Sequence, residues 1–239
     1  NFSGSDFYRL KKLKILPIVV KTADKVFNVS KKIHSDLIRN YSNNKKFFYT
    51  SNGINTNIFK NLNFKRKKQF VAVGNLRWQK NYSKILNAFA IFSKKRLDYK
   101  LLIIGEGDEK EKLKLEIKKL KLDKKVILCG YIGHKQIAKI VSESCIYLMS
   151  SVSEGLPKSL MESIACGTPV ITTNAGDCGL VAKDCGIVLS VKCKNETFAD
   201  SIYKMISNKA LWKKYKDNCL KNSNNYSWEK YCKNISKFY

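Results

Sequence analysis

A regular alternation of short apolar runs and longer amphipathic segments, from residue 70 onward, constrains the fold more than any other feature of this sequence. Three of the runs end at a glycine: FVAVG, LLIIG and VILCG. The segments between them, such as KNYSKILNAFAIFSKK, repeat their apolar residues at helical spacing. Buried runs of strand length separated by helices are typical of a parallel sheet covered on both faces. The sequence therefore predicts an α/β fold, a Rossmann-like parallel sheet with helices on both faces.

Six strands are expected in this sheet, at residues 70–74, 99–105, 125–130, 145–151, 169–173 and 186–190. Helices are expected at 80–95, 108–121, 135–144 and 158–166, and two or three more at the end of the chain. Strands that stop at a glycine leave an open loop at the carboxyl edge of the sheet, where such folds bind their ligands. The functional residues are therefore expected in the loops that follow the strands.

Residues 1–62 have a different pattern, with two short strands and one helix in ADKVFNVS, KKIHSDLIRNY and KKFFYTSNGI. Because so few elements cannot enclose a core of their own, we interpret this segment as the end of a preceding domain. A linker at 63–68 would join it to a larger domain at 69–223. The first residue is not a methionine, which fits the interpretation that the chain is a piece of a longer protein.

The composition limits the classes of partner. Lysine and arginine number 46 against 19 aspartate and glutamate, a formal net charge of +27. The lysines are spread along the chain without the interleaved aromatic residues of a single-strand nucleic-acid binder, so we expect no nucleic-acid partner and only a mild attraction to an anionic membrane. The eight cysteines form no Cys-x-x-Cys pair, which favours reduced, buried thiols over a metal site. No apolar run reaches the length that spans a bilayer.

Two carboxylates bracket a Gly-Leu-Pro turn in SEGLPKSLMESIACGTPVI, residues 153–171. Pro157 suits the first turn of a helix, so the N–H groups of residues 158–160 would be free to bind an anion such as a diphosphate. Glu154 before the turn and Glu162 on the helix would accept hydrogen bonds from sugar hydroxyls. A ligand with sugar, diphosphate and sugar in sequence is a nucleotide sugar. Alternatively, Glu154 only caps the helix and Glu162 is a charge on its wet surface.

The stretch SSVSEGLPKSLMESIACGTPVITT resembles the signature of family 4 of the retaining glycosyltransferases, which have the two-domain GT-B fold. VGNLRWQKN resembles the first glycine loop of that family, and LLIIGEGDEKEKL and VILCGYIGHKQIAKIVSESCIYLMSS resemble its next units. ADKVFNVS and TSNGINTNIF are similar to the end of its amino-terminal domain, and YSWEKYCKNISKFY to the helix that closes back onto that domain. The resemblance implies a partial second Rossmann-like domain at 1–62 and a closing helix at 224–239.

The resemblance also implies a role for each matching residue. Glu154 would contact hydroxyls of the transferred sugar and stabilise the charge that develops on it. Glu162 would hold the ribose, and Lys80 would neutralise the diphosphate. The other implied donor-binding residues act mainly through backbone groups or by leaving room for the ligand: Gly74, Tyr131, Ile132, Gly155, Leu156, Pro157, Ser159 and Leu160.

One position departs from the family pattern. The family usually has an arginine directly after the first-loop glycine, where this chain has Asn75. Asn75 can still donate hydrogen bonds to the donor, and Arg77, two residues on, would supply the missing charge. No Asp-x-Asp metal motif occurs in the sequence. The resemblance implies transfer without a metal or cofactor, with retention of anomeric configuration.

The sequence thus predicts the donor-binding part of a retaining, metal-independent glycosyltransferase. It would move a sugar from a UDP- or GDP-sugar to a saccharide or lipid-linked acceptor in glycan or polysaccharide biosynthesis. We expect it in the cytoplasm, with peripheral association at the cytoplasmic face of a membrane. The resemblance puts the acceptor site and a catalytic histidine in the amino-terminal domain, so this chain would bind a donor without turning over by itself. Two alternatives remain: a basic nucleotide- or polyanion-binding module, and a nicotinamide-type Rossmann oxidoreductase, although VGNLRW lacks the Gly-x-Gly-x-x-Gly pattern.

Overall fold

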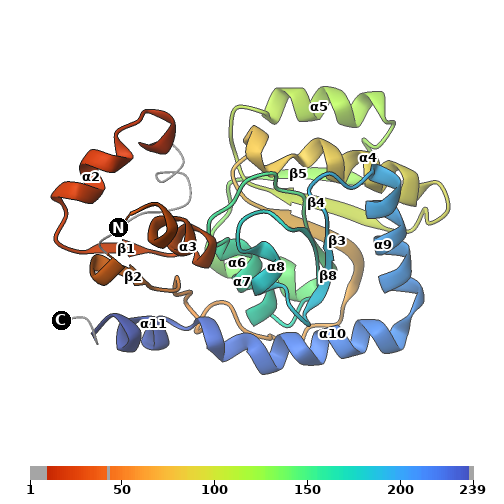
Figure 1. The fold of residues 1–239 in the computed structure, drawn as a ribbon. Coiled ribbons are helices and arrows are strands. Elements are labelled where there is room, and N and C mark those ends of the chain that lie inside the picture. The colour runs from red at the N-terminus through yellow and green to blue at the C-terminus, as the bar shows by residue number, and fades with distance from the viewer. Residues whose placement is uncertain (1–9, 42–43, 237–239) are drawn as a thin grey trace.

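The computed structural model describes residues 10–41 and 44–236. The predicted segments 1–62 and 224–239 therefore lie partly outside the described residues, at 1–9, 42–43 and 237–239. The larger part of the chain forms strands β3 Lys67–Val73, β4 Lys100–Ile104, β5 Val126–Gly130, β6 Ser144–Met149, β7 Val170–Thr173 and β8 Gly186–Leu189. They build one sheet in the order β5-β4-β3-β6-β7-β8, and every neighbouring pair is parallel. Helices cover both faces (Figure 1). The predicted α/β fold is confirmed.

The helices of this part are α4 Tyr82–Ser93, α5 Lys110–Lys119, α6 His134–Glu143, α7 Lys158–Ala165, α8 Cys178–Val181, α9 Asn195–Ser207 and α10 Lys209–Asn222. The sequence predicts α4 to α7, and it predicts α9 and α10 only as helices at the end of the chain. It does not predict α8, which is a single turn and too short to show a period. Two strand boundaries differ from the prediction by more than one residue. β3 starts ahead of its apolar run because the polar Lys67 pairs with β6. β6 ends at Met149, so Ser150 and Ser151 lie in the following loop.

Alternate side chains of the central strands pack into two cores. Phe70 of β3 packs with Phe89 and Phe92 of α4, whereas its neighbour Val71 belongs to the core that contains Leu160 of α7. The first core lies between the sheet and α4, α5 and α9, and the second between the sheet and α6, α7 and α8 (Figure 1). Because the central strands are buried on both faces, their sequences are continuous apolar runs rather than alternating ones.

The strand order creates a switch point between β3 and β6. From β3 the chain builds β4 and β5 on one side and then returns to β6, which lies on the other side of β3. The connections after β3 and β6 therefore leave the carboxyl edge of the sheet in opposite directions, which is where ligands bind in open α/β sheets. In this chain those two loops carry Lys80 and Glu154.

A smaller unit precedes the sheet, made of α2 Leu16–Thr22, β1 Val26–Asn28, α3 Lys31–Asn40 and β2 Phe47–Tyr49. Its two strands are parallel, and its core is limited to a few apolar side chains of these elements. At the other end of the chain α11, Trp228–Ile235, lies beside this unit (Figure 1), where a bridge joins Ile54 to Ser227. Within residues 10–41 and 44–236, no helix has the length and apolarity that crossing a bilayer requires.

Candidate functional site

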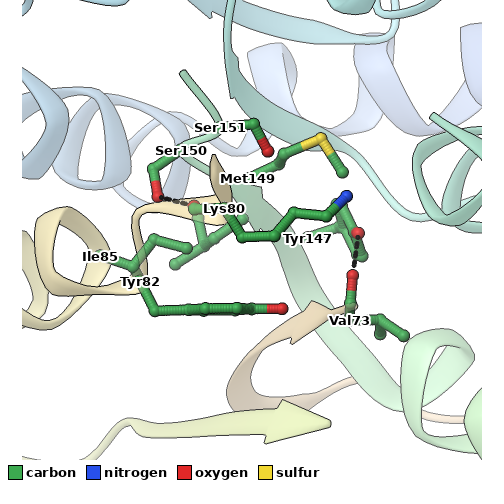
Figure 2. Close-up of a pocket in the computed structure, with 9 residues that line it drawn as sticks. Val73, Lys80, Tyr82, Ile85, Tyr147, Met149, Ser150 and Ser151 are labelled. Carbon is green, nitrogen blue, oxygen red and sulfur yellow. Dashed lines mark hydrogen bonds between the residues drawn. The ribbon is translucent and has the colours of Figure 1, made fainter. Parts of the chain in front are cut away.

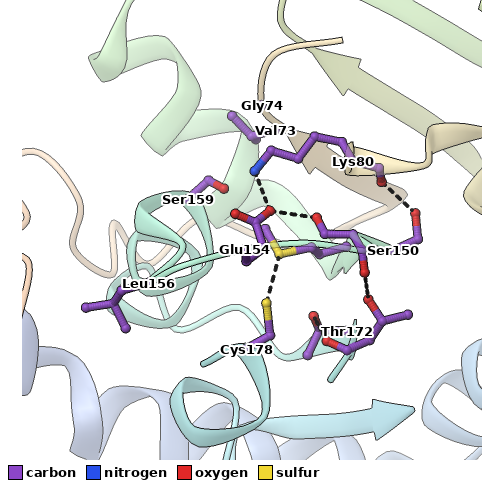
Figure 3. A network of polar contacts seen from close by, with 12 residues as sticks. Val73, Gly74, Lys80, Ser150, Glu154, Leu156, Ser159, Thr172 and Cys178 are labelled. Atoms are coloured by element: carbon purple, nitrogen blue, oxygen red, sulfur yellow. Dashed lines mark hydrogen bonds and ion pairs between the residues drawn. The ribbon is translucent and has the colours of Figure 1, made fainter. Parts of the chain in front are cut away.

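The two loops at the switch point meet through an ion pair. Lys80 Nζ lies 2.6 Å from Oε1 of Glu154 (Figure 3). The hydroxyl of Ser151 donates to the same carboxylate oxygen at 2.7 Å. The side chains of Lys80 and Glu154 keep 23% and 12% of their surface exposed. The pair is thus largely shielded from bulk water, and its remaining exposure leaves it accessible to a ligand.

Hydrogen bonds to backbone carbonyl oxygens fix both loops around this pair. The hydroxyl of Ser150 donates to the carbonyl oxygen of Lys80 at 3.0 Å, and the N–H of Val152 donates to the carbonyl oxygen of Gln79 at 2.8 Å. On the other side, the hydroxyl of Thr173 at the end of β7 donates to the carbonyl oxygen of Ser151 at 2.6 Å. The loop after β6 is therefore held between the loop after β3 and the end of β7, which sets the position of its carboxylate.

A cavity of about 10 Å³ lies next to Lys80 (Figure 2). The hydroxyl of Tyr82 donates to the carbonyl oxygen of Gly74 at 2.8 Å, and that of Tyr147 donates to Val73 at 3.1 Å, so the polar groups around it are satisfied. A cavity of this volume admits one water molecule at most. A ligand of nucleotide size would therefore bind at the outer surface of the two loops rather than inside the sheet.

Helix α7 begins directly after the Gly-Leu-Pro turn, with Pro157 at its N-cap position and no side chain capping it. In the described part of the chain, no hydrogen bond occupies the N–H groups of residues 158–160. The alternative in which Glu154 caps this helix is therefore wrong, because its carboxylate pairs with Lys80 instead. The hydroxyl of Ser159 lies 2.8 Å from that of Tyr147. The backbone amide of Ser159 has no such partner in the described structure and is available to a ligand.

Glu162 lies one turn further along α7 and is half-buried. Burial raises the pKa of its carboxyl to about 7, and the ammonium group of Lys158 opposes this shift. Among the described residues, no side-chain hydrogen bond or ion pair joins this carboxylate. It is thus not the solvated surface charge of the alternative interpretation. A carboxylate that has lost water without gaining a partner is suited to accept hydrogen bonds from a ligand.

The other predicted site residues lie at the same edge of the sheet without joining this network. Asn75 and Arg77 follow β3 and are exposed, and the side chain of Arg77 forms no ion pair within the described chain. After β5, the ring of Tyr131 is 83% exposed, while Ile132 packs against the core under α6 and α7. Gly74 approaches the next loop so closely that a Cβ on Gly105 would lie 2.1 Å from its carbonyl oxygen.

A third loop borders the site, residues 174–177 after β7, and it was not predicted from the sequence. The N–H of Asp177 donates to the carbonyl oxygen of Gly155 at 3.0 Å. Gly176 has φ +54°, and a Cβ there would lie 2.1 Å from the carbonyl oxygen of Glu154, so only glycine fits. Ser151 was missed as well. Their position could have predicted them, since each of these residues lies in the loop that follows a buried strand at the ligand-binding edge.

Comparisons with known proteins assign the chain to a family. The sequence profile of the family described as "Glycosyl transferases group 1" matches residues 53–225. The chain belongs to this family. Glycosyl transferases group 1 thus accounts for the whole sheet and for both loops that carry Lys80 and Glu154. The predicted oxidoreductase and non-enzymatic alternatives find no support in these comparisons.

Two relatives illustrate the similarity to other glycosyltransferases. The amylovoran biosynthesis glycosyltransferase AmsD of Erwinia amylovora is 30% identical over 186 residues, which are 76% of this chain and 50% of that protein. A Campylobacter jejuni protein is 29% identical over 227 residues, 90% of this chain and 60% of that protein. Its name is N-acetylgalactosamine-N,N'-diacetylbacillosaminyl-diphospho-undecaprenol 4-alpha-N-acetylgalactosaminyltransferase. The chain thus spans between half and three fifths of the length of these two relatives.

Solved structures agree on the fold. The structure of HepE from Anabaena in complex with UDP superposes with a TM-score of 0.83 at 15% identity, covering 100% of this chain and 68% of that one. At that identity the likeness establishes the architecture alone. The chain therefore has the GT-B glycosyltransferase architecture, in which the six-stranded sheet is one Rossmann-like domain and the smaller unit carries a two-stranded parallel sheet.

Proposed function

We propose that this chain is the donor-binding part of a retaining, metal-independent glycosyltransferase that uses a UDP- or GDP-sugar. The observation that carries the proposal is the pair of Lys80 and Glu154 at the switch point, beside a helix whose first N–H groups have no partner in the described structure. During transfer, the bond between the anomeric carbon and the phosphate oxygen would break, and one from that carbon to an acceptor hydroxyl oxygen would form as the hydroxyl loses its proton. The nucleoside diphosphate leaves with added negative charge. Lys80 and the start of α7 would stabilise that charge without a metal ion.

Donor binding would exchange the partners within this pair. The ammonium group of Lys80 would turn from the carboxylate to the diphosphate, and Glu154 would accept hydrogen bonds from the sugar hydroxyls. Its negative charge would also stabilise the positive charge that develops at the anomeric carbon. Glu162, which has no side-chain partner among the described residues, would take the ribose hydroxyls. Arg77 would supply a second cation in place of the arginine that Asn75 replaces.

The relatives support a donor and an acceptor class for this proposal. HepE was solved with UDP, which favours a uridine nucleotide. The Erwinia protein is named for polysaccharide biosynthesis, and the name of the Campylobacter protein contains a diphospho-undecaprenol. We infer a saccharide or lipid-linked acceptor, reached from the cytoplasmic side of a membrane. In this proposal residues 1–62 complete the acceptor-side domain, 63–68 link it to the donor domain at 69–223, and 224–239 close back onto it.

Calorimetric titration of the chain with UDP, GDP and ADP, each with magnesium and with EDTA, tests the proposal. We expect one nucleotide to bind preferentially, with the same affinity in EDTA. Lys80→Ala and Glu162→Ala should each weaken it by about 10- to 100-fold, the value of one or two charge-assisted hydrogen bonds. Lys118→Ala, an exposed lysine of α5, is the matched control. Equal affinity for all three nucleotides, or binding that Lys80→Ala leaves unchanged, would contradict the proposal.

A further inference from the structure

One carboxylate joins the smaller unit to the sheet. Oδ2 of Asp177 accepts a hydrogen bond from the backbone N–H of Lys31 at 2.6 Å, and Oδ1 accepts one from Lys32 at 3.3 Å. The first of these contacts links residues 146 positions apart in the chain. Asp177 is only 4% exposed, although it lies in the loop after β7. A buried carboxylate is costly unless its oxygens are satisfied, so this contact accounts for its burial.

Asp177 completes the start of helix α3. The hydroxyl of Ser30 accepts from the N–H of Ile33 at 3.3 Å, and Asp177 takes the N–H groups of the two preceding residues, Lys31 and Lys32. The first three N–H groups of the helix are thus all satisfied, and a negative charge lies at the positive end of its dipole. Without this carboxylate, docking of α3 on the loop would bury two N–H groups that have no acceptor.

The same residue supports the loop that carries Glu154. The N–H of Asp177 donates to the carbonyl oxygen of Gly155, and Gly176 packs directly under the carbonyl of Glu154. A second contact from the smaller unit reaches this loop, because the side-chain amide of Asn52 donates to the carbonyl oxygen of Leu156 at 3.3 Å. Asp177 and Gly176 thus contact the carbonyls of Gly155 and Glu154, so a displacement of Asp177 would reach the backbone of Glu154 and of the residue after it.

We propose that Asp177 is a positioning residue that couples the seating of α3 to the placement of Glu154. Recognition of the sugar then depends on contact between the two units, whereas recognition of the nucleotide, through Lys80 and α7, does not. The consequence for the sugar rests on the proposed function. The coupling itself is a property of the fold and has a readout that needs no nucleotide.

Hydrogen exchange measured by mass spectrometry on the whole chain tests the coupling. Asp177→Asn keeps the shape but turns one oxygen into a donor group, and Asp200→Asn on the exposed face of α9 makes the same charge change elsewhere. With Asp177→Asn we expect exchange at residues 30–36 and 150–157 to accelerate by about tenfold, a common size of coupling between sites. Residues 82–93 should stay at the wild-type rate. Faster exchange at 30–36 alone would make Asp177 a simple helix cap and overturn the proposal.

Affinities for nucleotides test the consequence for the sugar. The probes are UDP, UDP-glucose, UDP-N-acetylglucosamine, GDP and GDP-mannose. For Asp177→Asn, the affinity gained from the sugar should fall by about tenfold, while that for the bare diphosphate changes by less than about twofold. Asn52→Ala should act in the same direction, which keeps the test available if Asp177→Asn does not fold. Equal weakening of the bare nucleoside diphosphate and of its sugar derivative would overturn the proposal. Failure of the wild type to bind any probe would instead overturn the proposed function, with the exchange experiment still deciding the coupling.

Discussion

At the residue scale, the two carboxylates of the Glu-to-Glu motif have opposite environments. Glu154 is paired with Lys80 and accepts a hydrogen bond from Ser151. Glu162 has no such partner among the described residues, and burial raises its pKa to about 7. The carboxylate before the turn thus has a cation and a hydroxyl as partners, whereas the one on the helix is desolvated without a partner among the described residues, which destabilises its charged form. A ligand that donates hydrogen bonds binds more favourably to Glu162 than to Glu154, because these bonds offset the desolvation of the Glu162 carboxylate.

The raised pKa of Glu162 predicts a stability that depends on pH. Its ordinary value is 4.5, and the folded value is about 7, so the folded chain holds this proton more tightly than the unfolded chain. The favourable contribution is present below a pH of about 4.5 and is lost as the pH rises through about 7. Relative to wild type, Glu162→Gln should therefore gain up to about 3 kcal/mol in free energy of unfolding between pH about 4.5 and about 8.

Urea unfolding at the two pH values measures this difference. Glu111→Gln is the control, since the side chain of Glu111 is 76% exposed and removal of its charge should shift stability little. If the wild type and Glu162→Gln change in parallel between the two pH values, the carboxyl does not titrate as inferred.

Gly176 gives a second prediction at this scale. Alanine at this position has an unfavourable left-handed backbone and a Cβ inside the contact distance of the Glu154 carbonyl oxygen. We expect Gly176→Ala to lower the free energy of unfolding by about 2 kcal/mol or to displace the loop. Gly133→Ala is the matched control, because its Cβ would meet nothing within 4 Å. Thermal unfolding of the two variants compares them, and equal stability would refute the close contact.

At the scale of elements, the sequence predicts what local periodicity encodes. The six strands and the helices between them follow from apolar runs and helical spacing, because burial on one or two faces leaves its pattern within a single segment. The single turn of α8 was not predicted, and neither was α2, whose LPIVV run shows no helical period. Boundaries such as the start of β3 depend on pairing with another strand, which one segment cannot reveal.

The residues of the candidate site also differ in how far the sequence predicts them. The sequence pointed to Lys80 and Glu154 separately, but their ion pair depends on the strand order that places β3 beside β6. Asp177 had no signal beyond its place in the loop after β7, because its partners are the first N–H groups of a helix in the other unit. Residues that act within one motif could thus be predicted, and residues that act between elements could not.

Arg66 gives a prediction about how elements are held together. Its guanidinium is half-buried and donates to acceptors at the ends of α6 and α7: the carbonyl oxygens of Val141, Ser144, Cys166 and Gly167 and the hydroxyl of Thr168. A positive charge at two helix C-termini is favourable, and its removal takes one donor away from each of these groups. Arg66→Ala should lower the free energy of unfolding by about 3 kcal/mol.

Denaturant titration measures this loss. Lys65→Ala, at the exposed neighbouring residue, should stay within about 0.5 kcal/mol of wild type. Arg66→Lys should lose nearly as much as the alanine variant, because a single ammonium group cannot reach both helix ends. A loss no larger than that of Lys65→Ala would show that the bridge contributes little.

At the scale of the whole molecule, charge gives one more prediction. The net charge of +27 is large for 239 residues, and it should attract the chain to an anionic surface. In vesicle sedimentation we expect binding to phosphatidylglycerol-containing vesicles at about 0.05 M salt and release at about 0.5 M, as screening shortens the range of the attraction. Vesicles of phosphatidylcholine alone are the control. Equal binding to both lipids, or binding that salt leaves unchanged, would exclude an electrostatic attachment.

The bridge between Ile54 and Ser227 also has a consequence for the order in which the chain is made. The two backbone segments that it joins lie far apart in the sequence. Trp228 lies against Gly53 at the same place. During synthesis every strand from β3 to β8 is added to the chain before Ser227. The joint that fixes the smaller unit against the tail must therefore form last. Until then, only contacts among residues already made can hold the smaller unit against the sheet, such as those of Asp177 with the start of α3 and of Asn52 with Leu156.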